Sequence, residues 1–233
     1  FEQMSNKILQ IIKVDTSLVD EIKSSFGNLM TSDGVDANNR LRKFLKVKMQ
    51  KTFPSDATWP LKNYIIEPMD DSNEGPQQVE AMKKRFPNFV NKIQLIDNEF
   101  IESNAMYELL CAFYDAFELD NEAIIDVHQM RIMCVPRLGT GASTGAAHLS
   151  PQGWHQDGFN YLAIIGMGYH NVIGGEVMVS DSKTNPPFMK TRLEPGTMLL
   201  VKDDYLWHNA DTIQPLDPNK DAFVDIILLS TNK

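Results

Sequence analysis

The chain of 233 residues is long enough for one domain with a substantial hydrophobic core. Its longest apolar runs are far too short to cross a bilayer, so we expect no membrane partner. The formal net charge of -9 argues against a nucleic-acid partner, because binding to phosphates normally needs a basic surface.

The first part of the chain, residues 1–120, is predicted to be mainly helical. A weak capping signal at Ser17 and Asp20 precedes apolar residues at helical spacing, which are Leu18, Val19, Ile22, Phe26, Leu29 and Met30. A connection rich in Pro and Asp leads to a second helical region at residues 79–86. The strongest helix is expected from about Phe100 to Phe117, with its apolar residues on one side.

The sequence pattern changes in residues 121–233, where short apolar strings alternate with turn residues about every ten residues. The strings span 123–135, 161–168, 176–179, 188–193, 197–202 and 223–230. This pattern is typical of an antiparallel barrel or sandwich. We therefore expect a single β-rich α+β domain over residues 1–233, with the helices packed on one outer face of the sheets.

The cysteines, Cys111 and Cys134, each lie in an apolar segment and are interpreted as buried free thiols. Free thiols suit a reducing compartment, so we expect a cytoplasmic protein. The sequence begins at Phe1 rather than Met and opens with no charged-then-apolar leader, which constrains the compartment only weakly. The oligomeric state is left open.

A candidate metal site begins with His155 and Asp157, which form a His-x-Asp pattern. Residues two apart on a strand point to the same face, so both side chains can reach one metal ion. His208, which follows the apolar string 197–202, is the candidate third ligand. Two His and one carboxylate on one face of an octahedron are typical of oxygen-activating Fe(II) sites.

The second half of the chain resembles the Fe(II)/2-oxoglutarate-dependent dioxygenases, and within them the bacterial free amino-acid hydroxylases of the L-isoleucine 4-hydroxylase family. The resemblance covers roughly residues 120–233, and its matching segments are 127–131, 154–157, 171–176, 193–196, 207–210 and 222–228. It implies a double-stranded β-helix (jelly-roll or cupin-like) fold and an iron triad of His155, Asp157 and His208. It also implies 2-oxoglutarate as co-substrate and O2 as oxidant.

The chain departs from this family at Val224, where the related hydroxylases carry an Arg that anchors the distal carboxylate of 2-oxoglutarate. Arg131 is the preferred substitute, because a guanidinium binds a carboxylate bidentately. Gln129 shares its strand face and is expected to bind the co-substrate with it. Lys220 lies at a suitable distance along the chain, and Lys202 is a third candidate. His128, on the opposite strand face, is interpreted as structural.

The resemblance implies an enzyme of biosynthesis that oxidises an unactivated C–H bond of a small amino acid or amino-acid derivative and releases succinate and CO2. Hydroxylation is favoured, and oxidative cyclisation or desaturation is the first alternative. A non-catalytic metal-binding β-helix protein and a cupin-like metalloenzyme without 2-oxoglutarate remain open. The expected substrate carries a carboxylate, for which the candidate partners are Arg42, Lys43, Lys46, Arg131 and Arg137.

Overall fold

The computed structural model describes residues 8–29, 40–52, 63–69, 94–134 and 145–232. The helix predicted at residues 79–86 and the candidate substrate partner Arg137 lie outside these ranges.

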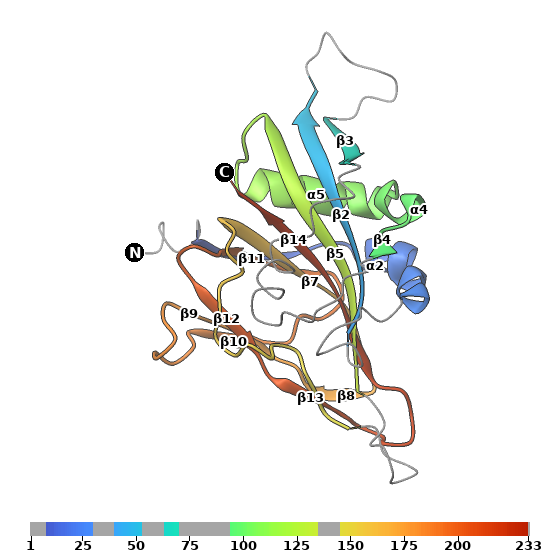
Figure 1. Cartoon of the computed structure of the whole chain (residues 1–233), viewed down its shortest axis with the longest axis vertical. Helices are drawn as coiled ribbons and strands as arrows, with labels where there is room; N and C mark the ends of the chain where they lie inside the picture. Colours follow the sequence, from blue (N-terminus) through green and yellow to red (C-terminus); the bar gives the residue numbers. More distant parts are fainter. Residues whose placement is uncertain (1–7, 30–39, 53–62, 70–93, 135–144, 233) are drawn as a thin grey trace, which may run out of the picture.

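The framework of the fold is a large, mostly antiparallel sheet that contains eight strands of the described chain. Its order is β1-β11-β7-β14-β5-β2-β3, and β4 pairs in parallel with β2. The bounds are β1 Leu9–Lys13, β2 Arg40–Lys51, β3 Tyr64–Met69, β4 Gln94–Leu95, β5 Glu122–Met133, β7 Tyr161–His170, β11 Thr197–Lys202 and β14 Phe223–Thr231. The long strands run diagonally through Figure 1, so segments from both halves of the chain lie side by side in one sheet.

Two three-stranded sheets in the described ranges complete the sandwich. One has the order β10-β9-β12 and the other the order β6-β13-β8. Their strands are β6 Ala147–His148, β8 Val172–Gly174, β9 Val177–Ser180, β10 Met189–Thr191, β12 Trp207–Ala210 and β13 Thr212–Pro215. Each packs its apolar side chains against one face of the large sheet, so this face lies in the barrel interior.

The helices cover the other face of the large sheet. They are α2 Thr16–Ile22, the 3-10 helix η1 Lys23–Asn28, α4 Asn98–Ile101 and α5 Asn104–Ala116. Helix α5 crosses behind β2 and β5 in Figure 1, and it buries Met106, Leu110 and Phe113 against the sheet. None of the helices in the described ranges is long and apolar enough to cross a membrane.

Strand alternation assigns each side chain of β2 and β5 to one of these faces. Val47 and Val127 belong to the core under the helices, whereas Met130 and Ile132 pack with Val224 in the barrel interior. The even-numbered residues of both strands therefore face the interior, and the odd-numbered residues face the helices.

The predicted fold class, a β-rich domain with helices on one face, is confirmed. The helix expected near Phe100 to Phe117 is present as α4 and α5, which are separated by the N-cap Ser103. The prediction that residues 1–120 are mainly helical is corrected by β1, β2, β3 and β4, which all lie in that segment. Helix α2 is capped by Asp15, whose carboxylate accepts the Ser17 N–H, and not by Ser17.

Candidate metal centre

Two segments about fifty residues apart in the sequence meet through an isolated antiparallel backbone pair. The N–H of His155 donates to the carbonyl of His208 over 3.0 Å, and the reverse hydrogen bond has the same length. His208 lies on β12, whereas His155 and Asp157 lie in the loop before β7 and not on the strand that we expected. The pairing places both histidines on directly opposite positions of the backbone.

The three side chains converge at this point. One donor atom from each of His155, Asp157 and His208 lies within 4.8 Å of the others. Nε2 of His155 lies 3.3 Å from Oδ1 of Asp157, and Nε2 of His208 lies 3.7 Å from the same oxygen. Among the described residues this is the cluster of His, Cys, Asp and Glu side chains with the spacing needed to hold a metal ion.

Neighbouring groups orient both imidazoles. Nδ1 of His155 lies 2.7 Å from the carbonyl oxygen of Gly153, which can only accept, so Nδ1 carries a proton and Nε2 is the ring nitrogen that faces Asp157. Nδ1 of His208 lies 3.4 Å from Oδ1 of Asp203, a fully buried carboxylate. A carboxylate or carbonyl behind a histidine is the usual support of a metal ligand.

Asp203 also fixes the loop that carries Asp157. Its Oδ2 accepts the backbone N–H of Asp157 at 2.7 Å and that of Gly158 at 3.0 Å. Gly158 has a φ of 89°, a conformation that favours glycine and turns two consecutive N–H groups toward one oxygen. One side chain therefore positions two of the three predicted ligands.

The electrostatics keep Asp157 ionised. Burial by itself raises its pKa, but the charge of His208 and the hydrogen bond from His155 outweigh this and lower the pKa to about 2. For His208, burial lowers the pKa, and the carboxylates of Asp157 and Asp203 outweigh burial, so that its pKa is raised. A metal cation that displaces the His208 proton would meet the same attractive carboxylates.

The wall beside this cluster carries a third histidine, His128 on β5. Its side chain faces the interior, and its ring lies 5.0 Å from the ring of Phe44 on β2. Burial and the charge of Arg42 lower its pKa to about 3, and the charge of Asp157 opposes the shift. The charges of His128 and Asp157 act on each other, so His128 lies within electrostatic range of the metal cluster.

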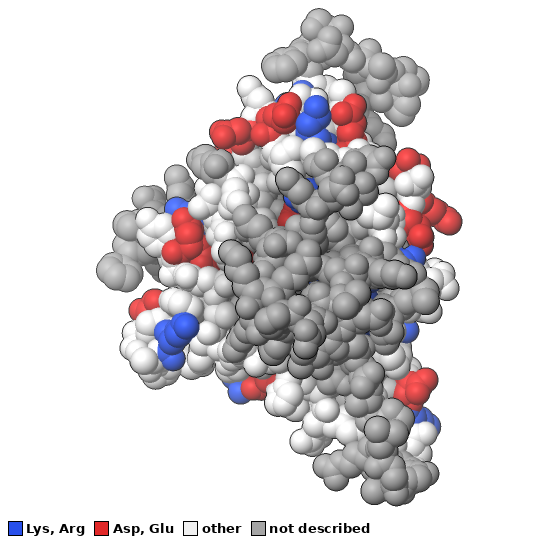
Figure 2. Space-filling view, viewed as in Figure 1, with Lys and Arg blue, Asp and Glu red and all other residues white. Residues whose placement is uncertain are grey.

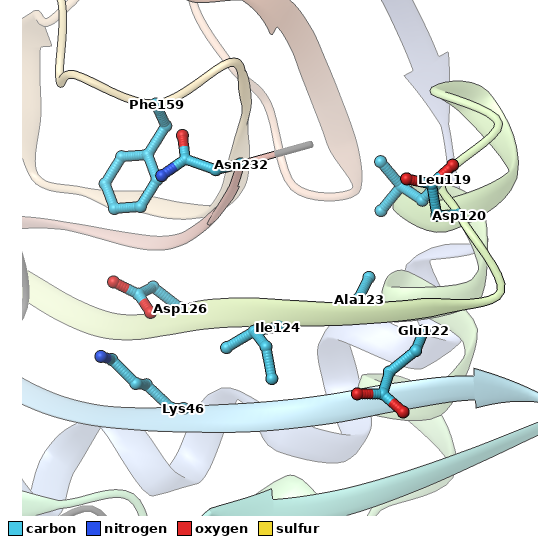
Figure 3. A pocket seen from close by; sticks show the side chains of 9 residues that line it. All are labelled: Lys46, Leu119, Asp120, Glu122, Ala123, Ile124, Asp126, Phe159 and Asn232. Atoms are coloured by element: carbon cyan, nitrogen blue, oxygen red, sulfur yellow. The ribbon is translucent and has the colours of Figure 1, made fainter.

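A cavity of about 320 Å³ opens farther along the same face (Figure 3). Asp126 of β5 and Lys46 of β2 point toward one another there, and Phe159 and Asn232 line the opposite side (Figure 3). Burial raises the pKa of Asp126 to about 6, and the charge of Lys46 opposes this rise. Phe159 follows Asp157 by only two residues, so the cavity is a neighbour of the metal cluster.

The residues predicted to bind 2-oxoglutarate are not brought to this cluster. Arg131 faces the helix side of the sheet and donates to both oxygens of Asp225, at 2.7 and 2.9 Å. Gln129, on the same face, donates to the Ser25 hydroxyl at 2.8 Å. Lys220 lies 3.6 Å from Asp217 with 74% of its side chain exposed. The face of β5 that carries Gln129 and Arg131, which we expected to bind 2-oxoglutarate, therefore points away from the barrel interior.

Sequence reasoning missed Asp203 and did not show that His128 faces the interior. The Asp203-Asp204 pair directly after the buried string 197–202 was a usable signal, because polar residues at strand ends often serve a site. For His128 no local signal was sufficient, since alternation separates it from Gln129 and Arg131 but does not say which face is the interior.

The chain matches the family model described as "2OG-Fe dioxygenase" over residues 23–230. No curated protein matches the sequence. Among solved structures, the chain is similar to a BsmA homologue from Methylobium petroleophilum PM1, with 20% identity, coverage of 100% of this chain and 91% of the other, and a TM-score of 0.73.

It is also similar to IDO from Bacillus thuringiensis, with 16% identity, coverage of 99% of this chain and 92% of the other, and a TM-score of 0.70. A third similar structure is that of the Fe(II)/(alpha)ketoglutarate-dependent dioxygenase TqaL, with 11% identity, coverage of 100% of this chain and 84% of the other, and a TM-score of 0.60. These three likenesses show a shared fold. The family match over most of the chain shows that it belongs to the 2OG-Fe dioxygenase family of non-haem iron enzymes, which use Fe(II), 2-oxoglutarate and O2.

Proposed function

We propose that this dioxygenase oxidises an unactivated C–H bond of a small amino acid or amino-acid derivative, with His155, Asp157 and His208 as the iron ligands. The observation that carries the proposal is the convergence of these three donor atoms within 4.8 Å. Two imidazoles and one carboxylate fit Fe(II), and such a donor set leaves coordination positions for 2-oxoglutarate and O2. Residues 1–233 would act as one catalytic domain.

Bound Fe(II), 2-oxoglutarate and O2 would supply the oxidising power: one oxygen atom enters succinate as CO2 is released, and the other oxidises the substrate. The residues of the chain hold the site. The Gly153 carbonyl aims Nε2 of His155 inward, and Asp203 positions both His208 and the backbone at Asp157. Such preorganisation keeps the open positions on the substrate side.

The cavity in Figure 3 supports an amino-acid substrate. An α-amino acid carries one positive and one negative group, and the cavity offers the carboxylate of Asp126 and the ammonium of Lys46. Phe159 adds an apolar surface for a side chain. Because the pKa of Asp126 is about 6, binding of a substrate ammonium should weaken as the pH falls below that value.

The first test is an anaerobic titration of the protein with Fe(II) and 2-oxoglutarate, followed by the charge-transfer absorption of the ternary complex. His155→Ala should abolish this absorption. Aerobic screening of free amino acids and their N-substituted derivatives should then find compounds that stimulate succinate release. A product heavier by one oxygen indicates hydroxylation, whereas the loss of two hydrogens indicates cyclisation or desaturation.

The substrate class has its own test. Asp126→Asn should raise the KM of a cationic amino-acid substrate more than about tenfold, because a charge-assisted contact is lost. The exposed Asp221→Asn is the control and should leave the KM unchanged. Succinate release that responds to no amino acid or derivative, or an Asp126→Asn variant with an unaltered KM, would rule out the proposed substrate class.

A further inference from the structure

The interior face of the large sheet beside the metal cluster is polar on β2 and β5 but uncharged on β14. Strand β14 presents Val224, Ile226, Leu228 and Ser230 to the interior. Val224 is fully buried against Met130 and Ile132. No described side chain on the interior face of β14 therefore carries a positive charge that could pair with an anionic group of a small molecule.

His128 is a buried hydrogen-bonding group that no protein group satisfies within the described residues. Its exposure is 1%, and neither Nδ1 nor Nε2 has a hydrogen-bond partner there. A buried polar group left unsatisfied is costly, so such groups are usually completed by a ligand or an ordered water. The ring faces the interior, within electrostatic range of the predicted metal ligand Asp157.

Arg42 supplies positive charge at the same place. In the antiparallel register of β2 and β5, Arg42 is opposite Met130 and Phe44 is opposite His128, so Arg42 and His128 are diagonal neighbours on one face. The guanidinium acts on the imidazole strongly enough to lower its pKa. A planar guanidinium next to an imidazole N–H is a good match for the two oxygens of a carboxylate.

We propose that Arg42 and His128 form a carboxylate-binding site on the β2–β5 wall of the barrel, facing the metal centre. The site binds a carboxylate of a molecule held at the iron, either the distal carboxylate of 2-oxoglutarate or the carboxylate of the substrate. It replaces the anchor that the resemblance places at Val224, and it rests on the proposed function. Phe44 forms the apolar side of the site, against the ring of His128.

The test uses Arg42→Met and His128→Leu in the full chain, with Lys48→Met as the control. Lys48 lies on the same face of β2 but contacts the partly exposed Glu67 and Glu122 at 4.0 Å. Anaerobic charge-transfer titrations measure the Kd of 2-oxoglutarate and of 2-oxopentanoate, which lacks the distal carboxylate. Steady-state succinate release measures the KM of the amino acid that stimulates the wild-type enzyme most in the screen above.

If the site binds 2-oxoglutarate, both variants raise its Kd at least tenfold and change the Kd of 2-oxopentanoate less than twofold. If it binds the substrate, the Kd of 2-oxoglutarate stays within twofold, the KM of the amino acid rises at least tenfold, and succinate release becomes uncoupled from product. Lys48→Met should change none of these constants. Unchanged constants for both ligands in both variants would overturn the proposal.

The stability of His128→Leu separates a binding role from a structural one. Removal of an unsatisfied buried imidazole should leave the Tm of the ligand-free variant equal to or above that of the wild type. A lower Tm with unchanged ligand constants would make His128 a structural residue and overturn its part in the site. A wild-type protein that shows no charge-transfer absorption with Fe(II) and 2-oxoglutarate contradicts the proposed function itself, which is a different result.

Discussion

Asp203 has no exposed surface, and its two oxygens serve different parts of the metal centre. Oδ1 lies 3.4 Å from Nδ1 of His208, while Oδ2 accepts the N–H groups of Asp157 and Gly158. The side chain touches neither iron nor substrate in the proposed arrangement, so it is a positioning residue. Substitution of Asp203 should therefore disturb the orientation of His208 and of the loop that carries Asp157.

At the residue scale, we therefore predict that Asp203→Asn lowers the affinity for Fe(II) about 10- to 100-fold. An amide cannot accept as many N–H groups as the carboxylate and carries no charge to support the imidazole. Anaerobic metal titrations should reveal the difference. The adjacent Asp204, whose carboxylate accepts from the Asn160 amide at the surface, offers Asp204→Asn as a control with wild-type affinity. Equal affinities in the two variants would contradict the role of Asp203.

At the scale of the elements, the Arg131–Asp225 pair joins β5 to β14 on the helix side of the sheet. Arg131 and Asp225 are directly opposite in the strand register, and the guanidinium also stacks on the Phe223 ring at 3.8 Å. Burial raises the pKa of Asp225, and the charge of Arg131 opposes the rise. The pair holds two central strands together and leaves Arg131 no part in the interior.

We predict that Arg131→Met destabilises the fold by about 3 kcal/mol, because it leaves a buried carboxylate unpaired. The pKa of Asp225 would rise further above 3.8, so the loss should be small below that pH and should grow as the pH increases. Urea unfolding at several pH values measures this. The double variant Arg131→Met with Asp225→Val should recover most of the stability, and neither variant should change the Kd of 2-oxoglutarate. A pH-independent loss would contradict this explanation.

Strand β7 contains a β-bulge opposite Asp225 and Ile226 of β14. A Cβ atom at Gly166 would collide with the backbone carbonyl of Leu193, whereas a Cβ at Gly168 would meet nothing within 4 Å. Gly166 is therefore needed so that the segment before β11 can approach β7 closely.

Gly166→Ala should destabilise the protein by about 3 kcal/mol or more, since backbone must move to make room. Gly168→Ala is the matched control and should lie within about 1 kcal/mol of the wild type. Thermal unfolding of both variants tests the prediction. Equal Tm values would show that the backbone near Leu193 yields easily.

At the scale of the whole molecule, the charges are mixed across the visible face. Lys and Arg side chains are interspersed with Asp and Glu around the rim in Figure 2, and in this view the described residues gather no single basic patch. The largest apolar core lies between the helices and the large sheet, whereas the predicted metal site lies on the other side of that sheet. Metal binding should therefore stabilise the folded protein without changing the packing of the apolar core between the helices and the large sheet.

We predict that Mn(II), as a redox-inert substitute, raises the Tm of the protein by about 5–10 °C at a concentration of 100 times its Kd. Binding to the folded state alone contributes about 2.7 kcal/mol at that concentration, and each kcal/mol corresponds to about 2–4 °C in a domain of this size. A chelator should reverse the shift, and His155→Ala should abolish it. A shift that persists in His155→Ala would place the metal elsewhere in the chain.

Much of the fold could be predicted from local patterns, because turn residues and strand alternation are local properties. The string 197–202 coincides with β11, and the strings near 123, 161 and 223 begin within one residue of β5, β7 and β14. The long strand β2 was missed because most of its even positions are charged, although Leu41, Leu45, Val47 and Met49 alternate along it. Those charges face the barrel interior, an unusual place that no composition rule anticipates.

The sequence by itself determined the β-rich sandwich, the helix near residue 104 and the His-x-Asp pattern, since each depends on spacing within a few residues. Only the tertiary structure decided that His155 and His208 share one backbone pair, that Asp203 supports His208 and the loop at Asp157, and that His128 and not Arg131 faces the interior. The physical reason is that alternation distinguishes two faces of a strand, but the packing of helices on one side and small sheets on the other selects the inner face.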